Sequence, residues 1–156
     1  LGRREADIAL RILRPTELDL VARCITRVDL ALHASPSYLE RRGLPTTPAS
    51  FVDHDVVAFM HGPGGEGENA WLAANCPGAR VVLRTNSVAM VIEAVREGLG
   101  LGLAPRRIGD RDPRVVRLET PNPPAPREVW LAYHRDIEPS PRVRAVIDFL
   151  VDALRD

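Results

Sequence analysis

Apolar residues recur along this chain with two periods, one typical of strands and one typical of helices. Short apolar runs bounded by proline, glycine or polar turn residues predict strands at Ala6–Ile12, Val21–Thr26, Val28–Ala34, Asp55–Met60, Arg80–Arg84, Leu99–Ala104, Val115–Leu118 and Glu128–His134. The run Val28–Ala34 has apolar residues on both faces, which is typical of a buried parallel strand.

Capping signals predict helices between these strands. The expected helices are Ser37–Arg42, a second short helix from Pro48 through Val52, Val88 up to the C′ residue Gly98, and a last helix that opens at Pro141. The segment His61–Gly67 is expected to be a loop without regular structure. Strands that alternate with helices predict an α/β fold with largely parallel sheets.

Composition and charge exclude several classes of function. The chain has 21 basic and 21 acidic residues, and every basic residue is arginine. Neutral balance argues against nucleic-acid binding by this segment. The absence of lysine excludes a phosphate-loop lysine, a Schiff-base lysine and a lysine general base. No apolar run is long enough to span a bilayer, and no secretory leader opens the chain.

Several motifs that suggest chemistry have better structural explanations. The run Gly98–Gly102 follows a helix and precedes a strand, the reverse of a dinucleotide fingerprint, so these glycines are expected to let the strand pack closely under a helix or a ligand. The four histidines are scattered along the sequence, and we expect them at the surface or rim of the protein. The segment Asp53-His54-Asp55 is expected to lie in a solvated loop. The sequence therefore predicts no metal site, no catalytic set and no cofactor. Cys24 and Cys76 are expected to be free, largely buried thiols of a reducing cytosol, with a redox pair as the alternative.

The junction Thr85-Asn86-Ser87 is the most informative segment, because it joins the end of a strand to the start of a well-formed helix. Asn86 or Ser87 must cap that helix, which is a sufficient structural role. Alternatively, the junction is an anion-binding corner whose N–H groups donate hydrogen bonds to a small carboxylate or phosphate. Arg11, at the carboxyl end of the first strand, is either a bidentate partner for that carboxylate or the partner of an acidic neighbour.

Six blocks, taken in order, resemble the effector-binding domain of LysR-type transcriptional regulators. They are residues 6–11, 32–39, 84–87, 94–105, 129–134 and 140–150. The resemblance implies a periplasmic-binding-protein-like α/β fold, in which two Rossmann-like lobes are joined by two crossover strands, here Val28–Ala34 and Leu101–Arg107. Residues 1–28 and 107–156 would form the first lobe and residues 29–106 the second, with hinges near Arg27 and Arg106.

The winged helix-turn-helix DNA-binding domain and the first elements of the first lobe have no counterpart here, and the chain starts without methionine. We therefore expect an N-terminally truncated chain with an incomplete first lobe, an unpaired sheet edge and a tendency to self-associate.

The implied function is the effector-sensing regulatory domain of a cytoplasmic bacterial regulator, and not an enzyme. A small anionic metabolite, a carboxylate, would bind between the lobes and act allosterically on a DNA-binding domain outside this chain. The intact protein would be a homodimer or homotetramer that contacts DNA only through that domain, without membrane association. The expected effector-binding residues are Asn86, Ser87 and Val88 as donors, Arg11 as charge partner, Phe59 and His61 on one wall, and Pro105 on the hinge side. A transporter's solute-binding protein and an enzyme on the same scaffold are the alternatives.

Overall fold

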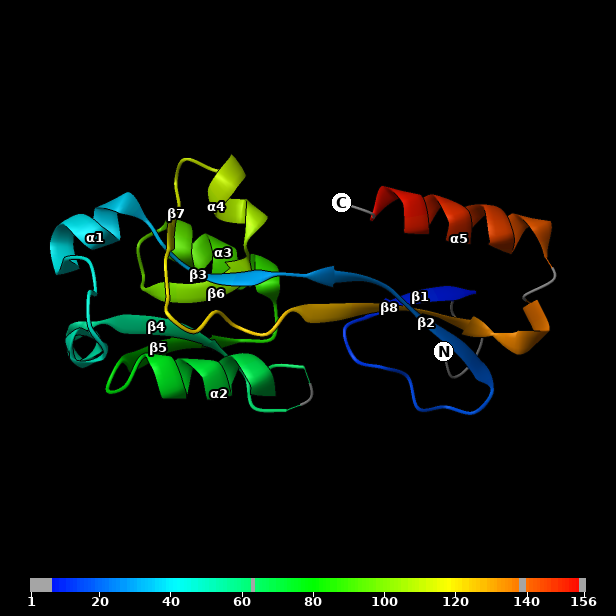
Figure 1. Ribbon diagram of the computed structural model, residues 1–156, viewed down its shortest axis with the longest axis horizontal. Coiled ribbons are helices and arrows are strands. Elements are labelled where there is room, and N and C mark those ends of the chain that lie inside the picture. Colours follow the sequence, from blue (N-terminus) through cyan, green and yellow to red (C-terminus); the bar gives the residue numbers. More distant parts are fainter. Residues whose placement is uncertain (1–6, 63, 138–139, 155–156) are drawn as a thin grey trace. The chain divides into compact units, whose positions relative to one another are not determined.

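The protein is described by a computed structural model covering residues 7–62, 64–137 and 140–154 (Figure 1). Ala6 of the first expected strand and Pro63 of the expected loop lie outside the described residues. The chain forms two compact α/β units. Unit 1 combines residues 1–28 with residues 126–156, and unit 2 comprises residues 29–125.

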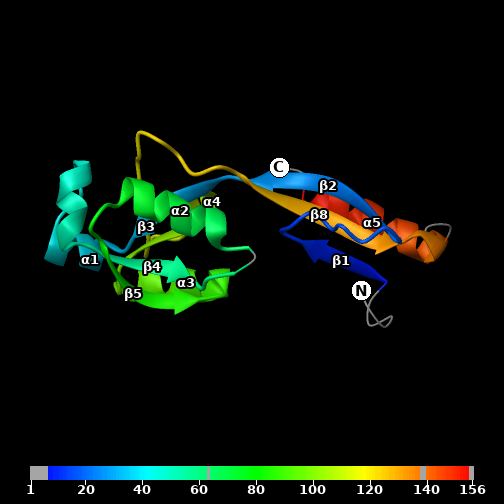
Figure 2. The same ribbon diagram turned by 90° about the horizontal axis from the view of Figure 1, so that it is seen from below.

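Unit 1 is built on a three-stranded antiparallel sheet in the order β1-β8-β2. Its strands are β1 (Ile8–Arg11), β2 (Leu20–Val28) and β8 (Arg127–His134). A 3₁₀ turn, η2 (Arg135–Ile137), follows β8, and helix α5 (Pro141–Ala153) runs along one face of the sheet in Figures 1 and 2. Leu131 of the central strand is fully buried, as befits a strand paired on both sides.

Unit 2 is built on a five-stranded mixed sheet in the order β5-β4-β6-β3-β7. Its strands are β3 (Leu30–Ala34), β4 (Asp55–Phe59), β5 (Arg80–Thr85), β6 (Leu101–Pro105) and β7 (Val116–Leu118). Its helices are α1 (Pro36–Arg42), the 3₁₀ helix η1 (Pro48–Asp53), α2 (Glu66–Asn75), α3 (Val88–Arg96) and α4 (Arg107–Arg111). Strand β4 runs parallel to β5 and β6, whereas β3 runs antiparallel to β6 and β7.

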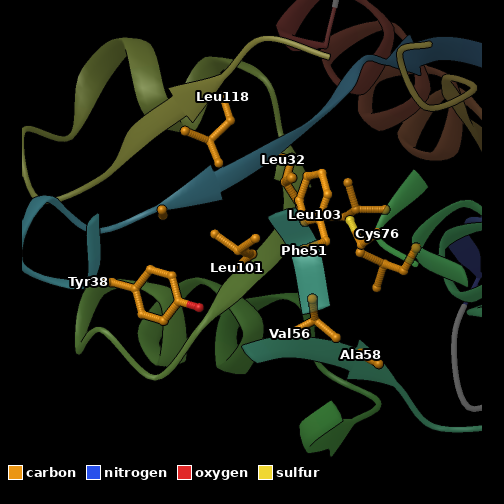
Figure 3. Close-up of a cluster of buried hydrophobic side chains, with 11 residues drawn as sticks. Leu32, Tyr38, Phe51, Val56, Ala58, Cys76, Leu101, Leu103 and Leu118 are labelled. Carbon is orange, nitrogen blue, oxygen red and sulfur yellow. The ribbon is translucent and has the colours of Figure 1, made fainter. Parts of the chain in front are cut away.

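Alternating residues of β4 divide the interior of unit 2 into two layers. Val56 and Ala58 belong to a cluster that also takes side chains from α1, η1, α2, β3, β6 and β7, and Figure 3 shows these side chains gathered on that face. Val57 and Phe59 point to the opposite face, where they pack with Val91 and other residues of α3. Both faces of the sheet are therefore covered by helices.

Two expectations about the elements are wrong. Strand β3 is antiparallel to both neighbours, so the sheets are not largely parallel. It is buried on both faces because it is an interior strand of a sheet covered on both sides, a condition that does not depend on strand direction. Helix α2 and the short helix α4 were not predicted, and the first two residues of α2, Glu66 and Gly67, were expected in the preceding loop. The N-cap of α2 is Gly65, which offers no side-chain cap, and Gly67 is a poor helix former.

The division of the chain differs from the expected one at its second boundary. Residues 107–125 belong to unit 2, not to the unit formed by the chain ends. Strand β7 pairs with β3, with Leu118 opposite Leu32, and Val115 packs in the α3 layer together with Ile108. Pairing and burial hold this segment in unit 2.

The glycine run has the packing role that its context indicated. A Cβ atom on Gly100 would lie 2.6 Å from the carbonyl oxygen of Asp55. One on Gly102 would lie 2.7 Å from Cγ2 of Val95 and 2.9 Å from Cγ1 of Val91. These glycines therefore let β6 approach β4 and α3 closely.

Candidate functional site

The corner between β5 and α3 is the candidate site. Strand β5 ends at Thr85, and Ser87 is the N-cap of α3, with its Oγ accepting from the Met90 N–H at 3.4 Å. The Ser87 N–H in turn donates to Oγ1 of Thr85 at 3.1 Å. Ser87 is thus the cap, and Asn86 is left as an exposed side chain at the corner.

The first turn of α3 carries positive potential. The N–H groups of Val88 and Ala89 have no acceptor within the helix, as in any helix start. The first turn holds no acidic side chain to compensate them. Because the helix dipole adds to the same end, the corner favours an anion.

The end of the neighbouring strand β4 forms the other side of this corner. The Met60 N–H donates to the Thr85 carbonyl at 3.0 Å, which joins the two strand ends. Asn69 of α2 accepts from the Phe59 N–H and donates to the Phe59 carbonyl, each at 3.0 Å, and Nη1 of Arg84 donates to the same carbonyl at 3.0 Å. These bonds fix the backbone from which the following turn begins.

The predicted wall residues differ in accessibility. Phe59 is 7% exposed and packs in the α3 layer with Val91, so it is a residue of the core. His61 is exposed in the turn after β4. Pro105 is the last residue of β6, half-buried opposite Leu30.

Arg11 lies in unit 1, at the end of β1, and is ion-paired. Its Nη1 is 2.8 Å from Oε1 of Glu17, and this hydrogen bond is the main reason that the pKa of Glu17 falls to about 2. The two residues also line an open depression of unit 1 formed by residues 10–17. The acidic neighbour considered as an alternative partner is therefore present.

The structure brings Asn86, Ser87 and Val88 together in one corner, which the sequence located from the strand-to-helix junction. Sequence reasoning missed Asn69 and Arg84, which hold the facing strand end. Neither residue belongs to a sequence motif, because each binds backbone atoms of Phe59 that come close to it only in the folded chain.

The expectation that all four histidines lie at the surface or rim is wrong for two of them. His33 is 1% and His54 3% exposed, and Asp55 is also buried. Asp55 forms ion pairs with Arg42 at 3.3 Å and Arg80 at 2.8 Å. His54 and Asp55 therefore lie in the core and not in a solvated loop, whereas Asp53 is exposed. Among the described residues, no group of three histidine, cysteine, aspartate or glutamate side chains is arranged to hold a metal ion, and no helix is long and apolar enough to cross a bilayer.

Comparison with known proteins gives a consistent picture. The family model of the LysR substrate binding domain matches residues 1–155. An uncharacterized HTH-type transcriptional regulator of Haemophilus influenzae is 29% identical over 112 residues, 65% of this chain and 36% of that protein. The chain thus spans about a third of the length of this curated relative.

Solved regulatory domains share the fold. That of CrgA, a LysR-type transcriptional regulator from Neisseria meningitidis, superimposes with a TM-score of 0.79 at 23% identity, over 97% of this chain and 77% of that one. The CcmR regulatory domain of Synechocystis PCC6803, in complex with 2-PG, gives 0.70 at 17% identity, over 97% and 75%. Since the family model covers nearly the whole sequence and these domains have its periplasmic-binding-protein-like α/β fold, the chain belongs to the LysR substrate-binding domain family.

Proposed function

We propose that this chain is the effector-sensing regulatory domain of a cytoplasmic LysR-type transcriptional regulator, and that its effector is a small carboxylate. The signal would pass to a DNA-binding domain elsewhere in a homodimeric or homotetrameric protein. The observation that carries the proposal is the uncompensated first turn of α3 beside Asn86 and Ser87.

The chemistry of this corner supports a carboxylate. The N–H groups of Val88 and Ala89 and the side chain of Asn86 are donors, and charge-assisted hydrogen bonds to an anion are stronger than neutral ones. The fold relative CcmR was solved in complex with 2-PG, so a related domain accommodates a small molecule.

The remaining predicted residues have supporting roles in this proposal. Arg11 would exchange Glu17 for the effector carboxylate, and both side chains of this ion pair are exposed enough for the exchange to cost little. Phe59 would support α3 from below, His61 would flank the ligand, and Pro105 would lie on the hinge side. The carboxylate would act as a signal only by binding one arrangement of the units more tightly than another.

Calorimetry with a panel of aromatic and aliphatic carboxylates tests the proposal. For the tightest ligand, we expect Arg11→Ala and Asn86→Ala each to weaken binding about tenfold or more, since hydrogen bonds to charged groups contribute roughly 1.5–3 kcal/mol. Glu17→Gln should tighten binding, because it releases Arg11 from its competing partner.

Matched controls come from the same chain. Arg114 forms an ion pair with Asp112 at 3.3 Å and is itself exposed, so Arg114→Ala should leave affinity unchanged. Ser140, an N-cap whose side chain makes no capping bond, is the control for Ser87→Ala. If Arg11→Ala, Asn86→Ala and Ser87→Ala all leave affinity unchanged, the assigned site is wrong.

The two alternatives receive no support. The matching family is a domain of transcriptional regulators and not an enzyme family, and the comparisons do not favour a transporter's solute-binding protein.

A further inference from the structure

His33 occupies an unusual position in unit 2. It lies in β3, an interior strand, between Gly102 of β6 and Arg117 of β7. The side chain is 1% exposed, and neither ring nitrogen has a hydrogen-bond partner; within the described part of the chain these are the only buried side-chain polar atoms left without one. An unpaired buried polar group is destabilising, so its presence calls for a role.

Helix α4 lies directly on this ring. A Cβ atom on Gly109 would be 3.0 Å from both Cδ2 and Nε2 of His33, and 3.1 Å from Cβ of Arg117. A side chain at position 109 would require the ring or the helix to give by a few tenths of an ångström. The same helix is tied to β7 by an ion pair, in which Nη1 of Arg117 is 2.8 Å from Oδ1 of Asp110.

The surroundings of the ring favour neutral imidazole. Burial is the main cause that lowers the pKa of His33, and the Arg117 guanidinium on β7 lowers it further. Backbone groups of Ala31 and Arg106, which lie near the ring without forming a regular hydrogen bond to it, act in the opposite direction, and so does Asp110 on α4. Because Asp110 is already paired with Arg117, it is poorly placed to neutralise an imidazolium.

The remaining neighbours supply no counter-charge. On β6 the facing residue is Gly102, and α3 contributes the apolar Val91 and Val95 above it. The charged residue next to them, Arg96 of α3, is a cation held by Glu93 and Asp112.

We propose that α4 is an acid-sensitive latch, which closes on neutral His33 and is displaced from the sheet when the ring takes up a proton. Helix α4 follows β6 directly, close to the start of β3. Arg106 directly precedes α4, and its N–H donates to the Asp29 carbonyl at 2.8 Å, just before β3 begins. Opening of α4 would therefore loosen the place where β6 ends and β3 starts. This would add a response to protons to the response to a carboxylate, and it does not depend on the carboxylate site.

The direction of the response follows from proton linkage. A histidine in the open latch titrates near pH 6.5, whereas the closed latch resists protonation. The closed state is therefore fully favoured above pH 6.5 and loses stability as the pH falls below it, by up to about tenfold in the opening constant for each pH unit down to the pKa of the closed state.

Hydrogen exchange followed by mass spectrometry tests this, after correction for the intrinsic effect of pH on exchange. From pH 7.5 to pH 5.5 we expect faster exchange of the amides of residues 107–111 and 116–118 in the wild-type chain. His33→Leu, which cannot be protonated, should abolish the increase, and the exposed His61→Leu should retain it.

Gly109→Ala gives an independent check. Alanine normally stabilises a helix relative to glycine. Here its methyl group crowds the ring, so the same amides should exchange faster than in the wild-type chain even at pH 7.5. An NMR titration of His33 supplies a measurement that needs no variant, and a pKa below 6.5 is expected. A pKa of 6.5 or higher, or an equal acid response in wild type and His33→Leu, would overturn the proposal.

Discussion

Replacing Gly102 by alanine places one methyl group between β6 and α3. The new Cβ would lie 2.7 Å from Cγ2 of Val95 and 2.9 Å from Cγ1 of Val91, closer than carbon atoms pack. Val91 and Val95 are 0% and 1% exposed, and a valine in a helix has one strongly preferred rotamer. Neither methyl group can turn away, so α3 must shift from the sheet.

The size of the effect can be bounded. Inserting a methyl group into a well-packed core costs about 1–3 kcal/mol. With a urea dependence of about 2 kcal/mol per M, the midpoint of unfolding should fall by about 0.5–1.5 M. Trp71 of α2 reports on unit 2, and Trp130 of β8 reports on unit 1. In a Trp130→Phe background, the fluorescence of Trp71 therefore follows the unfolding of unit 2 alone.

Gly67→Ala is the matched control. It makes the same chemical change inside α2, where a Cβ meets nothing within 4 Å and the backbone is helical. Alanine should therefore stabilise unit 2 by about 0.5–1 kcal/mol. If Gly102→Ala raises the midpoint, or shifts it no more than the error of the measurement, the close packing of α3 on β6 is wrong.

Three further predictions concern other parts of unit 2. Tyr38→Phe removes a buried hydroxyl that accepts from the Asp55 N–H at 2.8 Å, and the unpaired N–H should cost about 1–3 kcal/mol in a urea titration. Arg96→Leu should raise the pKa of Asp112, now about 2, in an NMR titration, but not to its ordinary 3.8, because the larger causes are hydrogen bonds from the Arg114 backbone and side chain. Burial raises the pKa of the Cys76 thiol to about 12, so a thiol reagent at pH 8 should label it only after unfolding.

The elements that the sequence predicted well are those with local signals. Ser35 caps α1 by accepting from the Tyr38 N–H, and Gly43 ends that helix at a φ of 80°. The apolar spacing of α3 and the glycine after it, Gly98 at a φ of 70°, were likewise sufficient to locate the helix. Such signals act over a few residues and need no knowledge of the rest of the chain.

Strand direction and the assignment of residues 107–125 needed information that is not local. Burial of His33 and of its neighbours in β3 is the same for a parallel and an antiparallel interior strand. Pairing of β7 with β3 joins segments about 85 residues apart, so no pattern within either strand indicates it. The same reason explains why Asn69, which binds the Phe59 backbone, escaped notice.

The proposed carboxylate site and the proposed latch lie at opposite ends of α3, and this gives them a physical connection. At its start α3 presents Ser87 and free N–H groups, and at its last turn Arg96 holds Asp112, the residue that ends α4. Between the ends, Val91 and Val95 rest on Gly102 without room for a methyl group. A helix seated this tightly moves as one body, because close-packed interfaces transmit displacement instead of absorbing it. A small shift of α3 on binding an anion would therefore be carried to α4. If so, Gly102→Ala should alter hydrogen exchange at both ends of α3, which a merely local defect at Gly102 would not do.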